Sequence, residues 1–366
     1  MKKFLSRFSV IMLVSILLVG MFIQTNALDA INSNEEKIVK FDYPVKPGTE
    51  EWKKLDLSSR RKACEIPENI LKKLTTKQLV DIVLEYPYFM DIYAFNSIQV
   101  GFKTIYDRFN GLRELLERKD AGSELIEKYK TMNVIEKGNS LQMFDFANIE
   151  VLLGQEKILN QLSLSDSNEL FEIASIKYEQ KKNNVKFGFT VPIFYKTINE
   201  QNNVTYYNVY TPQGTAVQVF KMLDYSPDTP EEIQKGNDYV DNNYPSVTII
   251  REGTKGYNCH SYAWYSQSSD NEYWMQNPSA YMTDGSYGLI EHSWATTGTK
   301  VYYGSNADHS GIVNGRVLGP PAPGTTLMDL ILVESKWGAY GLIKHRIKDC
   351  PFEVDEDSDF KFYNKR

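Results

Sequence analysis

The chain has few of the side chains that most often build metal and redox sites. Its 366 residues include three cysteines and four histidines. No Cys-x-x-Cys or His-x-x-x-His spacing occurs among them, and such spacings are typical of zinc sites. The sequence therefore gives no reason to expect a metal, and the chemistry that its residues suggest needs no organic cofactor.

A block of basic residues is also missing. The chain contains 41 Lys and Arg against 47 Asp and Glu, which gives a net charge of −6. Nucleic acids and anionic membranes bind clusters of Lys and Arg, so we expect neither as a partner. Beyond the N-terminus, no segment is apolar enough to cross a membrane.

The one long apolar run lies at the N-terminus. Basic residues precede the run Phe8–Phe22, and Thr25-Asn26-Ala27 places small residues where signal peptides are cut. We therefore predict a secretory signal peptide over residues 1–27 and a secreted or cell-wall-associated protein. An uncleaved anchor is the alternative, although the run is short for a span of roughly 20 residues. No cysteine lies near the cut, so we expect no lipid anchor there.

The composition divides the rest of the chain into four regions. Residues 28–48 are polar and predict an extended spacer. Residues 49–182 predict a helical domain, because apolar residues recur at intervals of three and four. This domain shows no catalytic cluster, so we expect it to place the protein or to bind a protein partner. Residues 183–244 predict a connecting region of a β-hairpin and a helix, and residues 245–366 a second domain; the boundary lies somewhere in 180–240.

Several elements can be placed within these regions. In the helical domain we predict a helix over 77–84 behind Thr75-Thr76, one long amphipathic helix over Met90–Lys119, and further helices over Leu141–Tyr178. After it we predict a hairpin of 187–194 with 204–210, and strands at 215–220 and 247–250. Thr229-Pro230-Glu231-Glu232 combines a capping box with proline at the first helical position, and begins a helix to about residue 243.

An odd number of cysteines leaves at least one thiol unpaired in an exported chain. Cys64 and Cys350 could form a disulfide, which would leave Cys259 free and reactive. The alternative is that all three thiols are free and buried. Pairing cannot be derived from the sequence alone.

Cys259 lies in the most informative stretch, Gly256-Tyr257-Asn258-Cys259-His260-Ser261-Tyr262-Ala263-Trp264-Tyr265. A glycine turn leads into a helix for which Asn258 is a good N-cap, so Cys259 falls in the first turn. The helix dipole there stabilises a thiolate, and the unpaired backbone N–H groups could hold the oxyanion of an acylation intermediate. Cys259 is therefore the candidate nucleophile.

The candidate general base is His309. It precedes Ile312-Val313, and the pair Asn314-Gly315 predicts a hairpin turn between two short strands, so His309 begins a strand. The next strand, Leu330–Trp337, has a polar end, and Glu334 is its best candidate to orient the imidazole.

The other histidines are weaker candidates for the base. His292 lies between an acid and a serine, and is the rival of His309. His260 is next to Cys259, but neighbours on a helix point about 100° apart, so we expect no contact with the thiol. His345 follows a strand-like segment, and we expect a structural role for it.

These motifs resemble the CHAP and NlpC-type cysteine peptidase and amidase families over residues 245–350. The resemblance lies in a cysteine that begins a helix, a histidine opening a His-x-x-Ile-Val strand, and a glutamate in the next strand. In CHAP-like domains a polar Asn stands two positions after the acid, where this chain has Lys336. The resemblance implies a papain-like domain, with a Cys-bearing helix packed on an antiparallel sheet, that cuts amide or peptide bonds, commonly in bacterial peptidoglycan.

An aromatic segment, Tyr273–Tyr287, lies between the candidate nucleophile and base. It could fold over the cleft, with Trp274 and Tyr281 as substrate platforms, and we count Trp337 with them. The alternative is that these aromatic residues pin a long loop to the core.

We expect an α+β protein in which a helical N-terminal domain precedes a papain-like domain. The predicted function is exported cysteine hydrolysis of amide or peptide bonds in peptidoglycan or a peptide by Cys259, His309 and Glu334. One alternative is a catalytically silent papain-like binding module with a partner-binding helical domain. An acyltransferase or transpeptidase would use the same residues.

Overall fold

The structure is a computed structural model that describes residues 40–133, 140–182, 204–222, 229–320 and 325–366. The predicted signal peptide, most of the predicted spacer and the first strand of the hairpin predicted at 187–194 lie outside these residues. Within the described residues, no helix is long and apolar enough to span a membrane.

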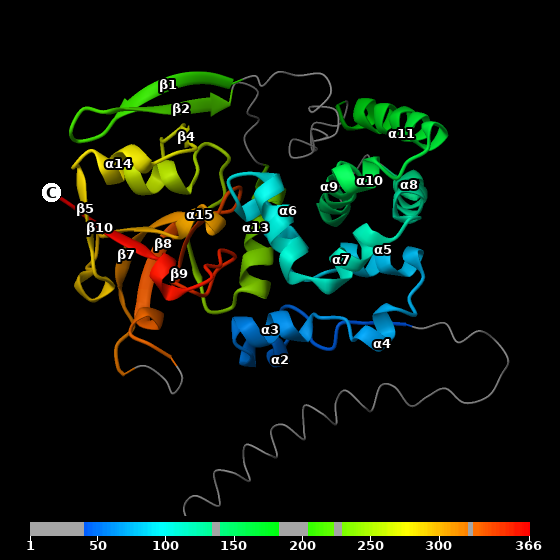
Figure 1. Ribbon diagram of the computed structural model, residues 1–366, viewed down its shortest axis with the longest axis horizontal. Helices are drawn as coiled ribbons and strands as arrows, with labels where there is room; N and C mark the ends of the chain where they lie inside the picture. Colours follow the sequence, from blue (N-terminus) through cyan, green and yellow to red (C-terminus); the bar gives the residue numbers. More distant parts are fainter. Residues whose placement is uncertain (1–39, 134–139, 183–203, 223–228, 321–324) are drawn as a thin grey trace, which may run out of the picture. The chain divides into compact units, whose positions relative to one another are not determined.

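The N-terminal half of the described chain is helical, as the sequence predicts (Figure 1). Helix α5 begins with a capping box in which Thr75 accepts from the Gln78 amide at 3.2 Å and Gln78 accepts from the Thr75 amide at 2.9 Å. The helices are α2 Glu50–Lys54, α3 Leu57–Ala63, α4 Glu68–Leu71, α5 Thr76–Leu84, η1 Phe89–Ala94, α6 Ile98–Arg108, α7 Asn110–Glu117, α8 Ala121–Thr131, α9 Ser140–Leu153, α10 Glu156–Leu159 and α11 Leu164–Lys182.

The single long helix predicted over 90–119 is wrong, because the chain breaks twice. Phe95 and Phe109 adopt extended conformations that place their rings in the core, where each is 5% exposed or less. Ser97 then starts α6 by accepting a hydrogen bond from the Val100 amide at 3.2 Å. Burial of two aromatic rings and a new N-cap therefore outweigh continuous helical periodicity.

The C-terminal half contains two antiparallel sheets, which confirms the α+β class (Figure 1). The larger sheet has seven strands in the order β3-β9-β8-β7-β6-β10-β5, and the smaller has three in the order β1-β2-β4. The strands are β1 Val204–Tyr210, β2 Ala216–Met222, β3 Thr248–Arg251, β4 Trp274–Met275, β5 Tyr287–Ile290, β6 Lys300–Tyr302, β7 Ser310–Arg316, β8 Ile331–Lys336, β9 Leu342–Arg346 and β10 Lys361–Lys365.

Short helices connect these strands. The predicted capping box at Thr229 is confirmed, because it starts α13 with Glu232 as its reciprocal partner. The strands predicted near 215–220, 247–250 and 330–337 are confirmed as β2, β3 and β8. The helical elements are α13 Pro230–Asn243, η3 Ser261–Tyr265, α14 Ser279–Thr283, η4 His292–Trp294, α15 Gly304–Ala307, η5 Met328–Leu330 and η6 Asp357–Asp359.

The hairpin turn predicted at Asn314-Gly315 is wrong. Strand β7 runs through both residues, and its register with β8 shifts between Val313 and Gly315. Gly315 takes a φ of 123°, which the absence of a side chain allows. A glycine inside a strand can mark a bulge as well as a turn, and in β7 it marks the bulge.

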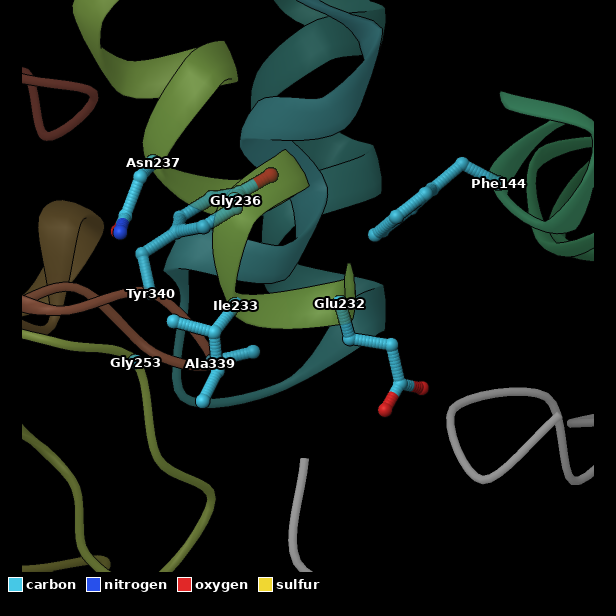
Figure 2. A pocket seen from close by; sticks show the side chains of 8 residues that line it. All are labelled: Phe144, Glu232, Ile233, Gly236, Asn237, Gly253, Ala339 and Tyr340. Atoms are coloured by element: carbon cyan, nitrogen blue, oxygen red, sulfur yellow. The ribbon is translucent and has the colours of Figure 1, made fainter. Parts of the chain in front are cut away.

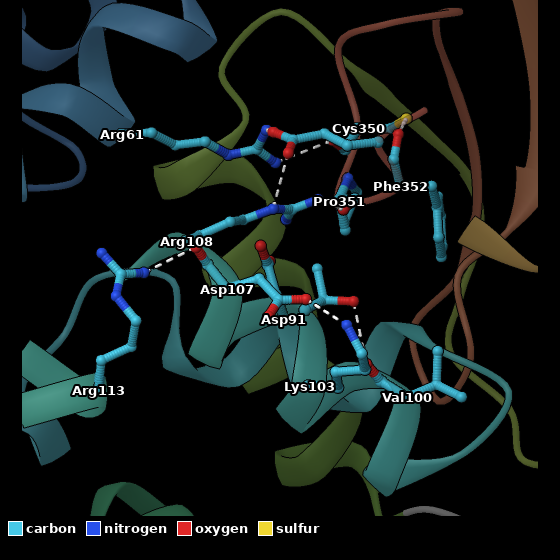
Figure 3. Close-up of polar contacts among 12 residues, drawn as sticks. Arg61, Asp91, Val100, Lys103, Asp107, Arg108, Arg113, Cys350, Pro351 and Phe352 are labelled. Atoms are coloured by element: carbon cyan, nitrogen blue, oxygen red, sulfur yellow. Dashed lines mark hydrogen bonds and ion pairs between the residues drawn. The ribbon is translucent and has the colours of Figure 1, made fainter. Parts of the chain in front are cut away.

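Residues Phe41–Arg366 form one compact unit, so the helices pack directly on the sheet region. Figure 3 shows part of this contact, in which Arg61 and Arg108 reach the segment after β9. Arg108 donates to the Pro351 carbonyl at 2.9 Å and pairs with Glu353 at 2.9 Å. Arg61 donates to the Cys350 carbonyl at 3.2 Å. The domain boundaries inferred from the sequence stay a prediction.

The disulfide that the sequence allows between Cys64 and Cys350 is absent, and both are buried free thiols. Cys350 instead lies within 3.5 Å of the carbonyls of Ile347 and Phe352, at 3.5 and 3.4 Å, so its own turn accepts the thiol hydrogen. Cys259 is also free and buried.

Candidate functional site

Cys259 lies in the first turn of a short helix, as predicted. The Asn258 side chain accepts from the Ser261 amide at 3.1 Å, which is the expected N-cap. The helix continues as a π-helical turn over Ser261–Tyr265. Such turns are rare and occur often at functional sites.

The Asn258 side chain also ties this turn to strand β4. Its Nδ2 donates to the Met275 carbonyl at 2.7 Å, and its Oδ1 accepts from the Met275 amide at 3.1 Å. The amide group is therefore held in one orientation by backbone groups on both sides, and the start of the helix is fixed against the smaller sheet.

The Cys259 thiol is 2% exposed and has two polar neighbours. Its Sγ donates to Oδ1 of Asn96 at 3.3 Å, and Asn96 comes from the segment between η1 and α6. Cys259 also lies close enough to His260 for its charge to raise the pKa of the imidazole. The hydrogen bonds of the described residues do not join the two side chains, so the expectation that the His260 ring does not contact the thiol stays a prediction.

His260 is fully buried between Ser310, the first residue of strand β7, and Asp308, which comes just before that strand. Its Nδ1 lies 2.8 Å from the Ser310 hydroxyl, and its Nε2 lies 3.1 Å from Oδ1 of Asp308. Ser310 also accepts from the indole N–H of Trp264 at 2.9 Å. Because a carboxylate can only accept, Nε2 carries a hydrogen toward Asp308.

The surroundings of His260 favour its charged form. Burial acts against the imidazolium, but the charge of Cys259 and the hydrogen bond with Asp308 raise the pKa of His260 to about 10. Nearby opposite charge outweighs desolvation at this position. Cys259 and Asp308 thus favour the imidazolium form of His260.

Asp308 joins Cys259 and His260 to the solvent. It has a φ of 44°, and it is the one residue other than glycine with positive φ among those the structure describes. It forms the C-cap of α15, where aspartate tolerates the left-handed conformation. Burial, followed by the charges of Asp308 and Cys259, raises the pKa of Tyr302 to about 12. The Asp308 side chain is 35% exposed, so the site meets the surface at this residue.

His309 lies elsewhere. Its ring stacks on Phe352 with centroids 3.4 Å apart and an interplanar angle of 7°. Its Nε2 is buried without a hydrogen-bond partner in the described part of the chain. Burial, with the charges of His345 and His260, holds the pKa of His309 well below its usual value. Its described contacts do not include Cys259.

Glu334 has other partners than the one expected. Its carboxylate accepts from the Tyr262 hydroxyl at 3.2 Å and from the side-chain amide of Asn314. The structure therefore brings Glu334 to the helix that carries Cys259, through Tyr262, while its described hydrogen bonds do not include His309. The three residues predicted as a triad are not joined by these contacts.

The predicted substrate platforms are largely buried. Trp274 is 9% exposed and donates to the Lys255 carbonyl at 2.6 Å, while Tyr281 is 2% exposed and packs near Trp264. Trp337 is fully buried and donates to the Ser335 hydroxyl at 3.0 Å. This burial favours the alternative in which the aromatic residues hold the loop to the core.

The remaining histidines do not approach the thiol through any contact in the described residues. His292 is half-buried in the turn η4, where its carbonyl accepts from Arg316 at 2.6 Å. His345 is buried, with Nε2 2.8 Å from the Ser335 hydroxyl and Nδ1 2.7 Å from the Arg346 carbonyl. The described residues also contain no cluster of three or more His, Cys, Asp or Glu side chains that could hold a metal ion.

A hollow lies beside α13 and is lined by other residues than those around Cys259. Figure 2 shows the side chains around it, which come from α9, α13 and the loops that follow β3 and β8. Glu232 is its acidic member, with one carboxylate oxygen on the Thr229 amide at 2.7 Å and the other buried without a partner. Neither Cys259 nor the residues that surround its thiol line this hollow, so the hollow is not a substrate site for Cys259.

The sequence singles out Cys259, sets His260 aside, and gives no prediction for Asp308 or Asn96. The one signal for Asp308 in the sequence is its place directly before His309. A histidine that opens a strand favours His309 as the base, whereas the Asp308 carboxylate contacts His260. Asn96 carries no local signal, because it lies 163 positions from Cys259.

Comparison of the chain with protein-family models, curated proteins and solved structures finds no match in any of the three.

Proposed function

We propose that the protein is an exported cysteine hydrolase that cleaves amide or peptide bonds by acyl transfer on Cys259. The observation that carries this proposal is that Cys259 lies beside a buried His260, whose pKa its charge raises and whose ring is held by the Asp308 carboxylate. A nucleophile, a proton carrier and an orienting acid placed next to one another are the parts that covalent hydrolysis requires.

His260 is the proton carrier that the contacts favour. The imidazolium form lowers the cost of the thiolate beside it, which is the reactive form of cysteine. Asp308 holds the ring through Nε2, so Nδ1, which lies 2.8 Å from the Ser310 hydroxyl, is the nitrogen that must exchange the proton with the thiol and the leaving amine. The assignment of His309 as base stays a prediction, with no described contact to the thiol.

The reaction then proceeds in two balanced steps. The Cys259 thiolate attacks the amide carbonyl carbon, the C–N bond breaks, and His260 gives its proton to the departing amine. Water next attacks the thioester and passes a proton to His260, and the C–S bond breaks to release the carboxylic acid. The thiolate and the imidazolium are both restored.

Peptidoglycan peptides are the proposed substrates, on the grounds of the predicted signal peptide and the resemblance to cell-wall hydrolases. Because Cys259 is 2% exposed, the substrate must displace part of the cover over the thiol. The Asp308 side chain is 35% exposed, so the substrate would enter from the side of this residue. An amine in place of water would give transpeptidation with the same residues.

Replacement of the nucleophile tests the proposal. In Cys259→Ala, release of new amino groups from purified peptidoglycan should fall by at least ~10³-fold, measured with reductant present. Cys64→Ala is the matched control, since Cys64 is also a buried free thiol and should keep activity per folded molecule. Equal activity in Cys259→Ala, or no hydrolysis by the wild type, would favour the binding module.

A further inference from the structure

Asn96 is the contribution of the helical region to the cysteine site. It lies between η1 and α6, and its side chain makes three hydrogen bonds to the sheet region. Oδ1 accepts from Cys259 at 3.3 Å and from Nδ2 of Asn258 at 3.1 Å, while Nδ2 donates to the Asp308 carbonyl at 2.8 Å. One side chain therefore contacts both the nucleophile and the residue that orients its proton carrier.

The orientation of the Asn96 amide follows from its partners. Asn258 uses its Oδ1 for the amides of Ser261 and Met275, so it presents N–H to Asn96. The Asp308 carbonyl can only accept, so Asn96 must present its own N–H there. The oxygen of Asn96 is thus the atom that faces the thiol. Exchange of its oxygen and nitrogen would break the hydrogen bonds with Asn258 and with the Asp308 carbonyl.

The segment that carries Asn96 is held firmly on the sheet region. The Ala339 amide donates to the Tyr93 carbonyl at 2.9 Å, and the Tyr340 hydroxyl donates to the Met90 carbonyl at 2.7 Å. Gly338, with a φ of 44°, approaches the backbone of Tyr93 and Ala94 so closely that a side chain would not fit. Asn96 is therefore placed by the packing of the residues just before it on the loop that follows β8.

We propose that Asn96 is a positioning residue that holds the Cys259 thiol in place and biases the Cys259–His260 pair toward its neutral form. A carbonyl oxygen accepts a hydrogen bond from S–H but has nothing to accept from a thiolate, so the contact favours the protonated thiol. Full reactivity then requires that substrate draws the Asn96 oxygen away from Sγ. The effect on catalysis rests on the proposed function. The preference for the protonated thiol does not, because it is a property of the protein without substrate.

The test is the rate of iodoacetamide alkylation at Cys259 against pH, with the site identified by mass spectrometry of the labelled peptide. In Asn96→Ala the midpoint of this profile should move to lower pH by roughly half to one unit, the size expected for one ordinary hydrogen bond. In Asn96→Asp the added carboxylate should move it to higher pH. Ser97→Ala is the control, because Ser97 caps α6 on the Val100 amide and has no described contact with the thiol; its midpoint should not move.

If Asn96 only shields the Cys259 thiol from the reagent, the alkylation profile should change in another way. Loss of a cover would raise the alkylation rate at every pH while the midpoint stays in place, and this outcome would overturn the proposal. Should Asn96→Asp fold poorly, the comparison of Asn96→Ala with Ser97→Ala still decides it. A shifted midpoint in a protein without hydrolytic activity would support the role of Asn96 while rejecting the proposed hydrolase.

Discussion

Two histidines of the sheet region share the same arrangement with a serine and a tryptophan. His260 contacts the Ser310 hydroxyl at 2.8 Å, and Ser310 accepts from Trp264 at 2.9 Å. His345 contacts the Ser335 hydroxyl at 2.8 Å, and Ser335 accepts from Trp337 at 3.0 Å. Both rings are at most 1% exposed, so burial and the serine do not distinguish them.

The second nitrogen of each ring makes the difference. In His260 it faces the Asp308 carboxylate, and this partner together with the charge of Cys259 raises the pKa to about 10 against the effect of burial. In His345 it faces the Arg346 carbonyl, and burial lowers the pKa to about 4 despite that hydrogen bond. One charged partner thus turns a structural arrangement into one that can carry protons.

The largest expected effect comes from exchanging histidine for glutamine at three positions. His260→Gln should lower the hydrolysis rate constant by ~10²- to 10⁴-fold, the range typical of a lost acid–base group. His345→Gln and His309→Gln should keep activity per folded molecule, because their described contacts do not include the thiol. Rates on peptidoglycan peptides, normalised to the folded fraction, are the measurement.

Alkylation of Cys259 in the same three variants gives an independent check of the comparison. The Cys64 and Cys350 thiols are internal references, because burial raises the pKa of each to about 12. Loss of reactivity at pH 7 in His309→Gln alone would restore His309 as the base and contradict the role proposed for His260.

A smaller effect is expected when the charge behind His260 is removed. In Asp308→Asn the imidazolium loses its carboxylate partner, so the pKa of His260 should fall and kcat should drop by roughly 10- to 100-fold. The pH–rate profile should move with it, which a loss of stability alone would not cause. Asp349→Asn, near His345 on the sheet, is the matched control and should leave the profile unchanged.

The smallest effect concerns stability in acid. A histidine with a lowered pKa in the folded state binds fewer protons there than in the unfolded chain, so its contribution is complete above about pH 6.5 and is lost as the pH falls toward about 4. For His345 the full contribution is about 3 kcal/mol. The free energy of unfolding from urea titrations should fall less steeply between these pH values in His345→Gln than in the wild type. His309 acts in the same direction, so part of the slope should remain; an unchanged slope would show that His345 is not buried as a neutral ring.

Local patterns decided much of the fold. Capping at Thr75 and Thr229 set the starts of α5 and α13, and Asn258 set the start of the helix that bears Cys259, because these hydrogen bonds join residues three apart. Alternating β-branched residues likewise placed β2, β3 and β8. Such signals fail where distant packing competes, as at Phe109, and where one residue type suits two structures, as at Gly315.

Neighbouring residues alone are enough to predict that the chain is α+β and that Cys259 begins a helix. The groups that the thiol faces depend on tertiary packing. Asp308 reaches His260 because β7 pairs into the sheet beside that helix, and Asn96 reaches Cys259 because η1 packs on the loop after β8. Contacts between residues tens to hundreds of positions apart are set by burial of whole faces, and local propensity carries no record of them.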